Sequence, residues 1–196
     1  TNNDDGHRTA SDLLAKGVNI SAIIDTRTDA PSSSEVEVLA GAQVTDTLGR
    51  LGVKQLTVQL ADGTKRHVQC EALGVSGGWN PNVHISSHQR GRPQWNADIA
   101  AFVPDQNGPP GLSSAGAAAG IFSTAGALES GAKSALAALN DLGISAKVAD
   151  LPRAEDAPVN LQPFWHVKSG KGRAWLDQQN DVTVKDVKLA HQENFR

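Results

Sequence analysis

Methionine and tyrosine are absent from this 196-residue sequence, and cysteine occurs once, as Cys70. A single cysteine excludes an internal disulfide and a Cys-x-x-Cys redox centre. We expect Cys70 to be a packed thiol in a strand rather than a reactive one. Because the sequence has no initiator methionine and opens on what resembles a turn into a helix, we expect an internal piece of a longer polypeptide.

Charge and hydropathy exclude two classes of partner. The net charge is −3, and the sequence has no basic stripe of the kind that nucleic-acid binding requires. No apolar run approaches the roughly 20 residues that a membrane-spanning helix needs. No secretory signal pattern is visible either. We therefore expect a cytoplasmic protein that binds neither nucleic acid nor membrane.

The first quarter of the chain has the pattern of half a βαβ unit. A helix is predicted from about Asp5 to Lys16, because acidic residues precede it and Gly17 follows it as a C-terminal cap. A strand rich in β-branched residues is predicted over Val18–Ile24, ending at Asp25. We expect this strand to run parallel to its neighbours.

Further strands and helices are predicted from periodicity and turn residues. Ala61-Asp62-Gly63 is a strong hairpin turn between two alternating segments. Residues 80–110 and 146–172 are expected to be mainly loops and a linker. The predicted elements are strands at Val36–Leu39, Val53–Leu60, Thr64–Cys70, a buried strand at Ala72–Ser76, an edge strand near Phe102–Val103 and a strand at Arg173–Gln178, and helices at Gly120–Leu142 and Val184–Phe195.

Two stretches of small residues are the most informative feature. Gly77 and Gly78 end the predicted strand at Ala72–Ser76, and Gly116 and Ala117 lie in a run expected to open the long helix. In open α/β sheets, such a strand end and helix start flank the crevice that binds a dinucleotide. Small residues also permit close packing of a helix on a sheet. The residues alone leave both alternatives open.

The opening residues form a degenerate phosphate-binding turn. Of a G-x-G-x-x-G pattern laid on Thr1–Gly6, only the last glycine is present. Asp4 and Asp5 would oppose a pyrophosphate at the helix start. Asp25 follows about 20 residues later, where a ribose-binding acid is expected. We interpret the turn as a structural copy, with nucleotide binding as the alternative.

The histidines and serines form no catalytic arrangement. His84 and His88 are four residues apart, a spacing that makes a metal pair only on a helix. Pro81, Ser86 and Ser87 argue against a helix there, so we expect solvated loop histidines. No nucleophile elbow or Ser-His-Asp order is present. The sequence therefore predicts no catalytic residue and no metal site.

Three spaced motifs together resemble the alpha subunit of heterotetrameric sarcosine oxidase. The motif around the predicted pocket is Gly74-Val75-Ser76-Gly77-Gly78-Trp79-Asn80-Pro81, followed by Ala115-Gly116-Ala117-Ala118. The most specific motif is Trp175-Leu176-Asp177-Gln178-Gln179-Asn180-Asp181-Val182-Thr183. The resemblance extends in order over essentially the whole chain.

This resemblance implies an α/β, thioredoxin-reductase-like fold of nested Rossmann-type nucleotide-binding domains, here incomplete. Residues 1–70 would be most of the inserted second domain, residues 71–145 the C-terminal half of the first, and residues 146–196 the linker and entry to a folate-binding domain. The implied cofactors are NAD, with FMN and FAD in the full complex and tetrahydrofolate in a downstream domain. The implied partners are the beta, gamma and delta subunits.

The resemblance also implies a function and a set of site residues. The family oxidises sarcosine to glycine and hydrogen peroxide and passes the one-carbon unit to tetrahydrofolate. Gly77, Gly78, Gly116 and Ala117 would line the NAD pocket, and Ala117 stands where related flavoenzymes carry an aspartate. The alternatives are an active pyridine-nucleotide-dependent flavin reductase and a non-catalytic interaction module.

Overall fold

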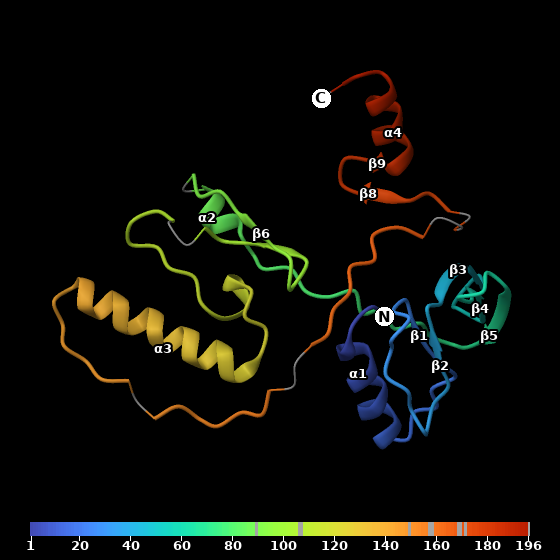
Figure 1. Cartoon of the computed structure of the whole chain (residues 1–196), viewed down its shortest axis with the longest axis horizontal. Coiled ribbons are helices and arrows are strands. Elements are labelled where there is room, and N and C mark those ends of the chain that lie inside the picture. The colour runs from blue at the N-terminus through green and yellow to red at the C-terminus, as the bar shows by residue number, and fades with distance from the viewer. Residues whose placement is uncertain are drawn as a thin grey trace. The chain divides into compact units, whose positions relative to one another are not determined.

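The computed structural model divides the chain into two compact units (Figure 1). Unit 1 comprises Thr1–Gly77 with Gln162–Arg196, and unit 2 comprises Gly78–Leu161. Helices and small sheets alternate along the chain, which agrees with the expected α/β class. Nested nucleotide-binding domains remain a prediction. The structure describes residues 1–88, 90–105, 108–148, 150–156, 159–167, 170 and 172–195.

Helix α1 (Asp4–Ala15) confirms the first predicted element. The side chain of its N-cap, Asn3, accepts a hydrogen bond from the backbone N–H of Asp5 at 3.0 Å. The helix stops before Gly17, whose φ of 80° is the left-handed conformation that glycine adopts readily. Ala10 on the inner face packs in a small apolar cluster with Ile23 and Val36.

Strands β1 (Ile23–Asp25) and β2 (Val38–Ala40) pair in parallel with Ile23 opposite Val38. The predicted strand over Val18–Ile24 was therefore too long at its start. Residues 18–22 have no partner strand in the described part of the chain. A strand sequence without a neighbour cannot form a ladder, which explains the shorter element.

A three-stranded antiparallel sheet contributes most of the core of unit 1. The predicted hairpin is confirmed, with Gly63 in its turn, and one strand was missed because its sequence is largely polar. Leu56 and Val58 lie at the centre of the core. Cys70 packs against it as expected, although it lies one residue beyond the strand. The strands are β3 (Gln43–Leu48), β4 (Gln55–Gln59) and β5 (Lys65–Gln69), in the order β3-β4-β5.

The predicted buried strand at Ala72–Ser76 was wrong. These residues have no regular secondary structure, and Val75 is 83% exposed. The segment is held instead by side-chain contacts: the Ser76 carbonyl accepts a hydrogen bond from Asn3 Nδ2 at 3.3 Å. A short apolar run does not by itself show whether a neighbouring strand is present to pair with it.

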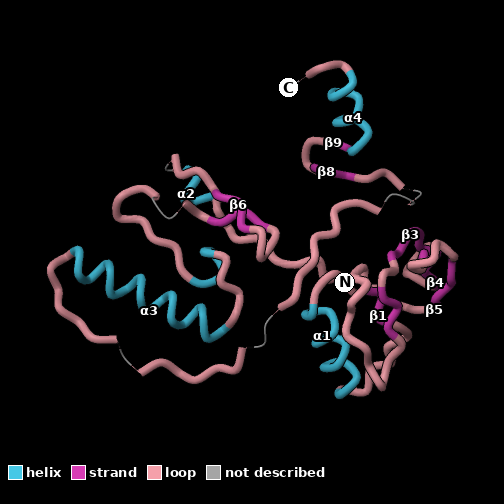
Figure 2. Tube along the Cα trace, in the orientation of Figure 1, coloured by secondary structure: helices cyan, strands magenta, loops and turns pink. Residues whose placement is uncertain are grey.

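Unit 2 combines a small hairpin with one long helix. The edge strand expected near Phe102 is confirmed as β7. The ring of Phe102 meets that of Trp95 edge-on, with 5.2 Å between the two ring centroids. Figure 2 shows that much of the remaining trace in this unit is loop. Its elements are α2 (His84–His88), β6 (Gln94–Asn96), β7 (Ala101–Val103), the 3₁₀ turn η1 (Gly116–Ala119) and α3 (Thr124–Asp141).

The long helix α3 begins four residues later than predicted. Gly120 has a φ of 83° and ends η1, so the small-residue run forms a 3₁₀ turn and does not open α3. Ser123 is the N-cap of α3, and its side chain accepts from the Gly126 N–H. Because an N-cap residue has extended backbone, the helix cannot include the residues before it.

The C-terminal elements agree closely with those predicted from the sequence. Strands β8 (Trp175–Asp177) and β9 (Val182–Thr183) precede α4 (Val184–Gln192). Thr183 and Asp186 form the predicted capping box, with both reciprocal hydrogen bonds present. None of the helices in the described ranges combines the length and apolar composition that crossing a membrane requires.

Candidate functional site

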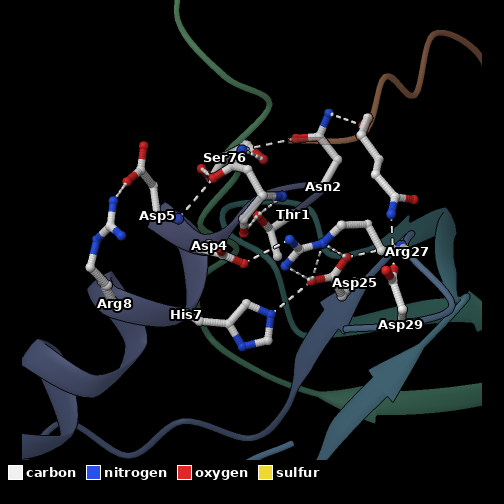
Figure 3. Close-up of polar contacts among 12 residues, drawn as sticks. Thr1, Asn2, Asp4, Asp5, His7, Arg8, Asp25, Arg27, Asp29 and Ser76 are labelled. Atoms are coloured by element: carbon white, nitrogen blue, oxygen red, sulfur yellow. Dashed lines mark hydrogen bonds and ion pairs between the residues drawn. The ribbon is translucent and has the colours of Figure 1, made fainter. Parts of the chain in front are cut away.

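A buried charged cluster lies where α1 begins beside the end of β1 (Figure 3). The side chains of Asp25 and Arg27 are 0% and 1% exposed. Arg27 Nη2 donates to Asp25 Oδ2 at 2.7 Å, and the Arg27 backbone N–H donates to Asp25 Oδ1 at 2.9 Å. The two residues therefore form a compact ion pair closed by the backbone.

Helix α1 contributes two further members of this cluster. Arg27 Nη1 donates to Asp4 Oδ1 at 2.7 Å. His7, three residues further along α1, places its Nε2 2.7 Å from Asp25 Oδ2. Residues three or four apart share one face of a helix, which explains why both side chains meet the same ion pair. Figure 3 shows the guanidinium between the two carboxylates.

The electrostatics of the cluster favour the charged forms of Asp25 and Arg27. Burial alone would raise the pKa of Asp25, but hydrogen bonds from Arg27 and His7 outweigh it and hold this pKa below its ordinary value. The hydrogen bonds to Asp25 and Asp4 in turn raise the pKa of Arg27 above its ordinary value. The Asp25–Arg27 pair is therefore ionised at neutral pH.

This geometry leaves Asp25 no accessible oxygen for a ribose. Both of its carboxylate oxygens accept hydrogen bonds from Arg27, and no part of its side chain reaches the surface. The positive end of α1 is already faced by Asp4, by Asp5 and by the Asn3 cap. A pyrophosphate would meet two carboxylates there. These observations support the interpretation of the opening turn as structural.

Gly77 and Gly78, two of the four predicted pocket residues, differ in their surroundings. A Cβ added at Gly77 would have no heavy atom within 4 Å, so the backbone is open to approach. Gly78 has a φ of 97°, and a Cβ there would lie 2.6 Å from Leu161 Cδ1. The conformation and close contact of Gly78 explain its need for glycine without a ligand. Gly77 has no such structural reason.

Gly116 and Ala117 lie in η1 against the side of α3. Gly116 has a φ of 58°, and its N–H donates to Ser130 Oγ at 3.3 Å. A Cβ at Gly116 would lie 3.4 Å from that of Ala127. These contacts give Gly116 a packing role against another helix, and not the packing of a helix on a sheet that the sequence alternative named. A cofactor role for Gly116 and Ala117 stays a prediction.

The histidine pair lies on a helix, contrary to the sequence prediction of a loop. His84 and His88 are the first and last residues of α2, a single short helix. The Asn82 side chain accepts from the His84 N–H at 3.3 Å and so helps to start it. Among the described residues, no group of three or more metal-binding side chains comes together, around this pair or elsewhere.

The sequence interpretation missed His7 and Arg27. The signal for Arg27 was available: a basic residue two positions after an acid at a strand end can fold back on it. His7 could be placed only once the pairing of α1 with β1 was known. The cluster combines residues 18 and 23 positions apart, a separation that no local motif reports.

Comparison with known proteins identifies relatives of the chain. No protein-family model matches it. Sarcosine oxidase subunit alpha of Rhizobium meliloti (strain 1021) is 32% identical over 199 residues, covering 100% of this chain and 20% of that protein. The subunits of the same name from Corynebacterium sp. strains P-1 and U-96 are each 33% identical over 208 residues, covering 95% of this chain and 21% of theirs.

The chain is a relative of sarcosine oxidase subunit alpha. The resemblance carried by the three sequence motifs is thereby confirmed. The chain spans about a fifth of the length of the curated relatives it matches. Its similarity to sarcosine oxidase subunit alpha extends through both units, and not through one motif only.

Proposed function

We propose that this chain belongs to a sarcosine-oxidising complex and serves there as a nucleotide-binding scaffold. The observation that carries the proposal is 32% identity to a sarcosine oxidase subunit alpha over the full length of the chain. In this proposal the complex oxidises sarcosine to glycine, forms hydrogen peroxide, and yields 5,10-methylenetetrahydrofolate. The partners are the beta, gamma and delta subunits.

NAD is the nucleotide that the proposal assigns to this chain, with Gly77, Gly78, Gly116 and Ala117 lining its pocket. Gly77 supports this assignment best, because its backbone has open space where a side chain would be. The opening turn is a poor alternative, since Asp4 and Asp25 are already paired with Arg27. FMN and FAD carry the redox chemistry, and the protein positions them.

The complete subunit, coexpressed with its partner subunits, is the material for the test. We expect the purified complex to release NAD on denaturation and to form hydrogen peroxide from sarcosine. A complex that lacks NAD, or that oxidises NADH and reduces added flavin, would contradict the scaffold role and favour a flavin reductase.

Gly77→Val tests the pocket assignment within the same complex. We expect the NAD content to fall at least about tenfold, because the new side chain would take the space proposed for the dinucleotide. Gly52→Val is the matched control: Gly52 also has no heavy atom within 4 Å of a Cβ position, and it lies in the β3–β4 loop. An equal NAD content in both variants would reject Gly77 as a pocket residue.

A further inference from the structure

Asn3 uses its side chain for more than the cap of α1. It is 0% exposed, although asparagine is rarely fully buried. Its Oδ1 accepts from the Asp5 N–H at 3.0 Å and from Ser76 Oγ at 3.1 Å. Its Nδ2 donates to Asn2 Oδ1 at 2.9 Å and to the Ser76 carbonyl at 3.3 Å. Capping accounts for the bond to Asp5 alone, so the bonds to Ser76 need a further explanation.

Segment 71–77 depends on Asn3 for its hydrogen bonds. Within the described part of the chain, the two bonds between Ser76 and Asn3 are the only hydrogen bonds that this segment makes. Ser76 is also the only residue of the segment that is not exposed. Figure 3 shows Ser76 close to Asn2 and the first turn of α1. Because the segment belongs to no helix or ladder, Asn3 sets the position of Ser76 and of the residue bonded to it, Gly77.

The contact with Ser76 needs the amide group of Asn3 and not only its size. The Ser76 carbonyl is an acceptor and requires a donor opposite, which Asn3 supplies through Nδ2 while its Oδ1 caps the helix. Aspartate caps helices as well as asparagine does, but an ionised aspartate has no donor. A carboxylate at position 3 would face the Ser76 carbonyl, in a turn that already carries Asp4 and Asp5. The contact therefore favours asparagine where the cap alone would accept aspartate.

We propose that Asn3 is a positioning residue for the nucleotide site, because it holds Ser76 so that the open backbone of Gly77 stays in place for the ligand. This inference rests on the proposed function, in which Gly77 lines the pocket for NAD. Asn3 itself does not touch the nucleotide, since its side chain is buried and bonded within the protein. Releasing Ser76 lets Gly77 move, and a binding segment that must first be ordered costs affinity.

Asn2 provides a matched control for this proposal. It is 7% exposed, and its Nδ2 donates to the Gln162 carbonyl at 2.9 Å, so it holds a different segment. Asn2→Asp and Asn3→Asp each replace a buried carboxamide with a carboxylate of the same shape, at adjacent positions. In Asn2→Asp, the Asn3 amide keeps its acceptor at position 2 and both bonds to Ser76. Only Asn3→Asp removes the donor to the Ser76 carbonyl.

The complete subunit, coexpressed with its partner subunits, carries each substitution. The first measurement is the rate of cleavage by thermolysin before Leu73 and Val75, which does not depend on NAD. Thermolysin cuts mobile segments ahead of large apolar residues, and Val75 is 83% exposed. The second measurement is the NAD content of the dialysed complex. We expect Asn3→Asp to speed the cleavage at least about tenfold and to lower the NAD content at least about threefold, with Asn2→Asp close to the unsubstituted complex in both.

Ser76→Ala is a milder variant that leaves Asn3 uncharged. It removes the bond from Ser76 Oγ and keeps the bond to the Ser76 carbonyl, so it should change both measurements in the same direction by a smaller factor. If Asn3→Asp prevents assembly of the complex, Ser76→Ala decides between the outcomes: wild-type values in both measurements would then overturn the positioning role.

Two further results would overturn the inference and leave the proposed function standing. Equal cleavage rates in the Asn2→Asp and Asn3→Asp complexes would show that the donor to Ser76 does not hold the segment. Faster cleavage of Asn3→Asp with unchanged NAD content would show that Asn3 holds the segment without serving the pocket. An unsubstituted complex without NAD is a different result, because it rejects the proposed function itself and, with it, a nucleotide for Asn3 to serve.

Discussion

Arg27 holds Asp25 in a bidentate ion pair, and the side chains of both residues are buried. Nε lies 3.1 Å from Oδ1 and Nη2 lies 2.7 Å from Oδ2. The same guanidinium reaches Asp4 on α1 through Nη1. The pair therefore connects the end of β1 to the start of α1, at the position where a nucleotide-binding turn would hold its ligand.

Replacing Arg27 with methionine should strongly destabilise unit 1. The substitution leaves the Asp25 carboxylate buried without its main partner, which costs about 3–5 kcal/mol in comparable sites. The control is Arg66→Met, which removes an exposed ion pair with Glu37 and should change stability little. Urea unfolding followed by circular dichroism measures both. Equal midpoints for the two variants would show that the buried pair contributes no more than the surface one.

The lowered pKa of Asp25 predicts acid sensitivity of unit 1. A carboxyl group with a depressed folded pKa contributes stability above its unfolded value, 3.8 for Asp25, and loses it as the pH falls below that value. We expect the free energy of unfolding to fall steeply below about pH 4. The double variant Asp25→Asn with Arg27→Met should flatten this acid limb. An unchanged acid limb in the double variant would assign the sensitivity to other carboxylates.

The N-cap of α3 should contribute measurably to the start of that helix. Ser123→Ala removes the oxygen that accepts from the Gly126 N–H, at a cost of about 1 kcal/mol. Ser123→Gly should cost only a few tenths, since glycine is itself a tolerated cap. Amide exchange at Ala125 and Gly126 distinguishes the variants. Asp156 also accepts from both of these N–H groups, so the loss is expected to be partial.

Local rules predicted the elements that depend on residues close in sequence. The Gly63 turn, the α1 helix with its Gly17 stop, and the Thr183–Asp186 capping box needed no information beyond their own segments. Two of the strand errors concern partners. Residues 18–22 and 72–76 have strand sequences, and whether a neighbour pairs with them cannot be determined from the segments themselves.

The candidate site shows the same difference between local signals, which the sequence reports, and distant partners, which it does not. Asp25 was found because its position after a strand is a local signal. Its partners were not, because Arg27 had to fold back on it and His7 had to approach from another element. At the small-residue run, composition alone placed Gly116 at a helix start. The left-handed backbone of Gly120 places it in a separate turn instead.

Two glycine-to-alanine substitutions in unit 2 should have opposite effects. A Cβ at Gly120 would lie 2.7 Å from Val103 Cγ1 and 2.9 Å from Ile99 Cδ1, with a φ of 83°. Gly120→Ala therefore combines a clash with backbone strain, and about 1–3 kcal/mol of destabilisation is expected. Gly131 lies inside α3, and a Cβ added there would have no heavy atom within 4 Å. Gly131→Ala should therefore stabilise the helix by roughly 0.5–1 kcal/mol.

Thermal unfolding followed by tryptophan fluorescence measures both effects in a Trp165→Phe, Trp175→Phe background, in which only Trp79 and Trp95 of unit 2 remain as reporters. A higher melting temperature for Gly131→Ala together with a lower one for Gly120→Ala agrees with the structure. Equal shifts for the two variants would contradict the left-handed turn between η1 and α3. That turn separates the Gly116–Ala117 stretch from the helix it was expected to open, so the pair of variants tests the local geometry on which any pocket at Gly116 depends.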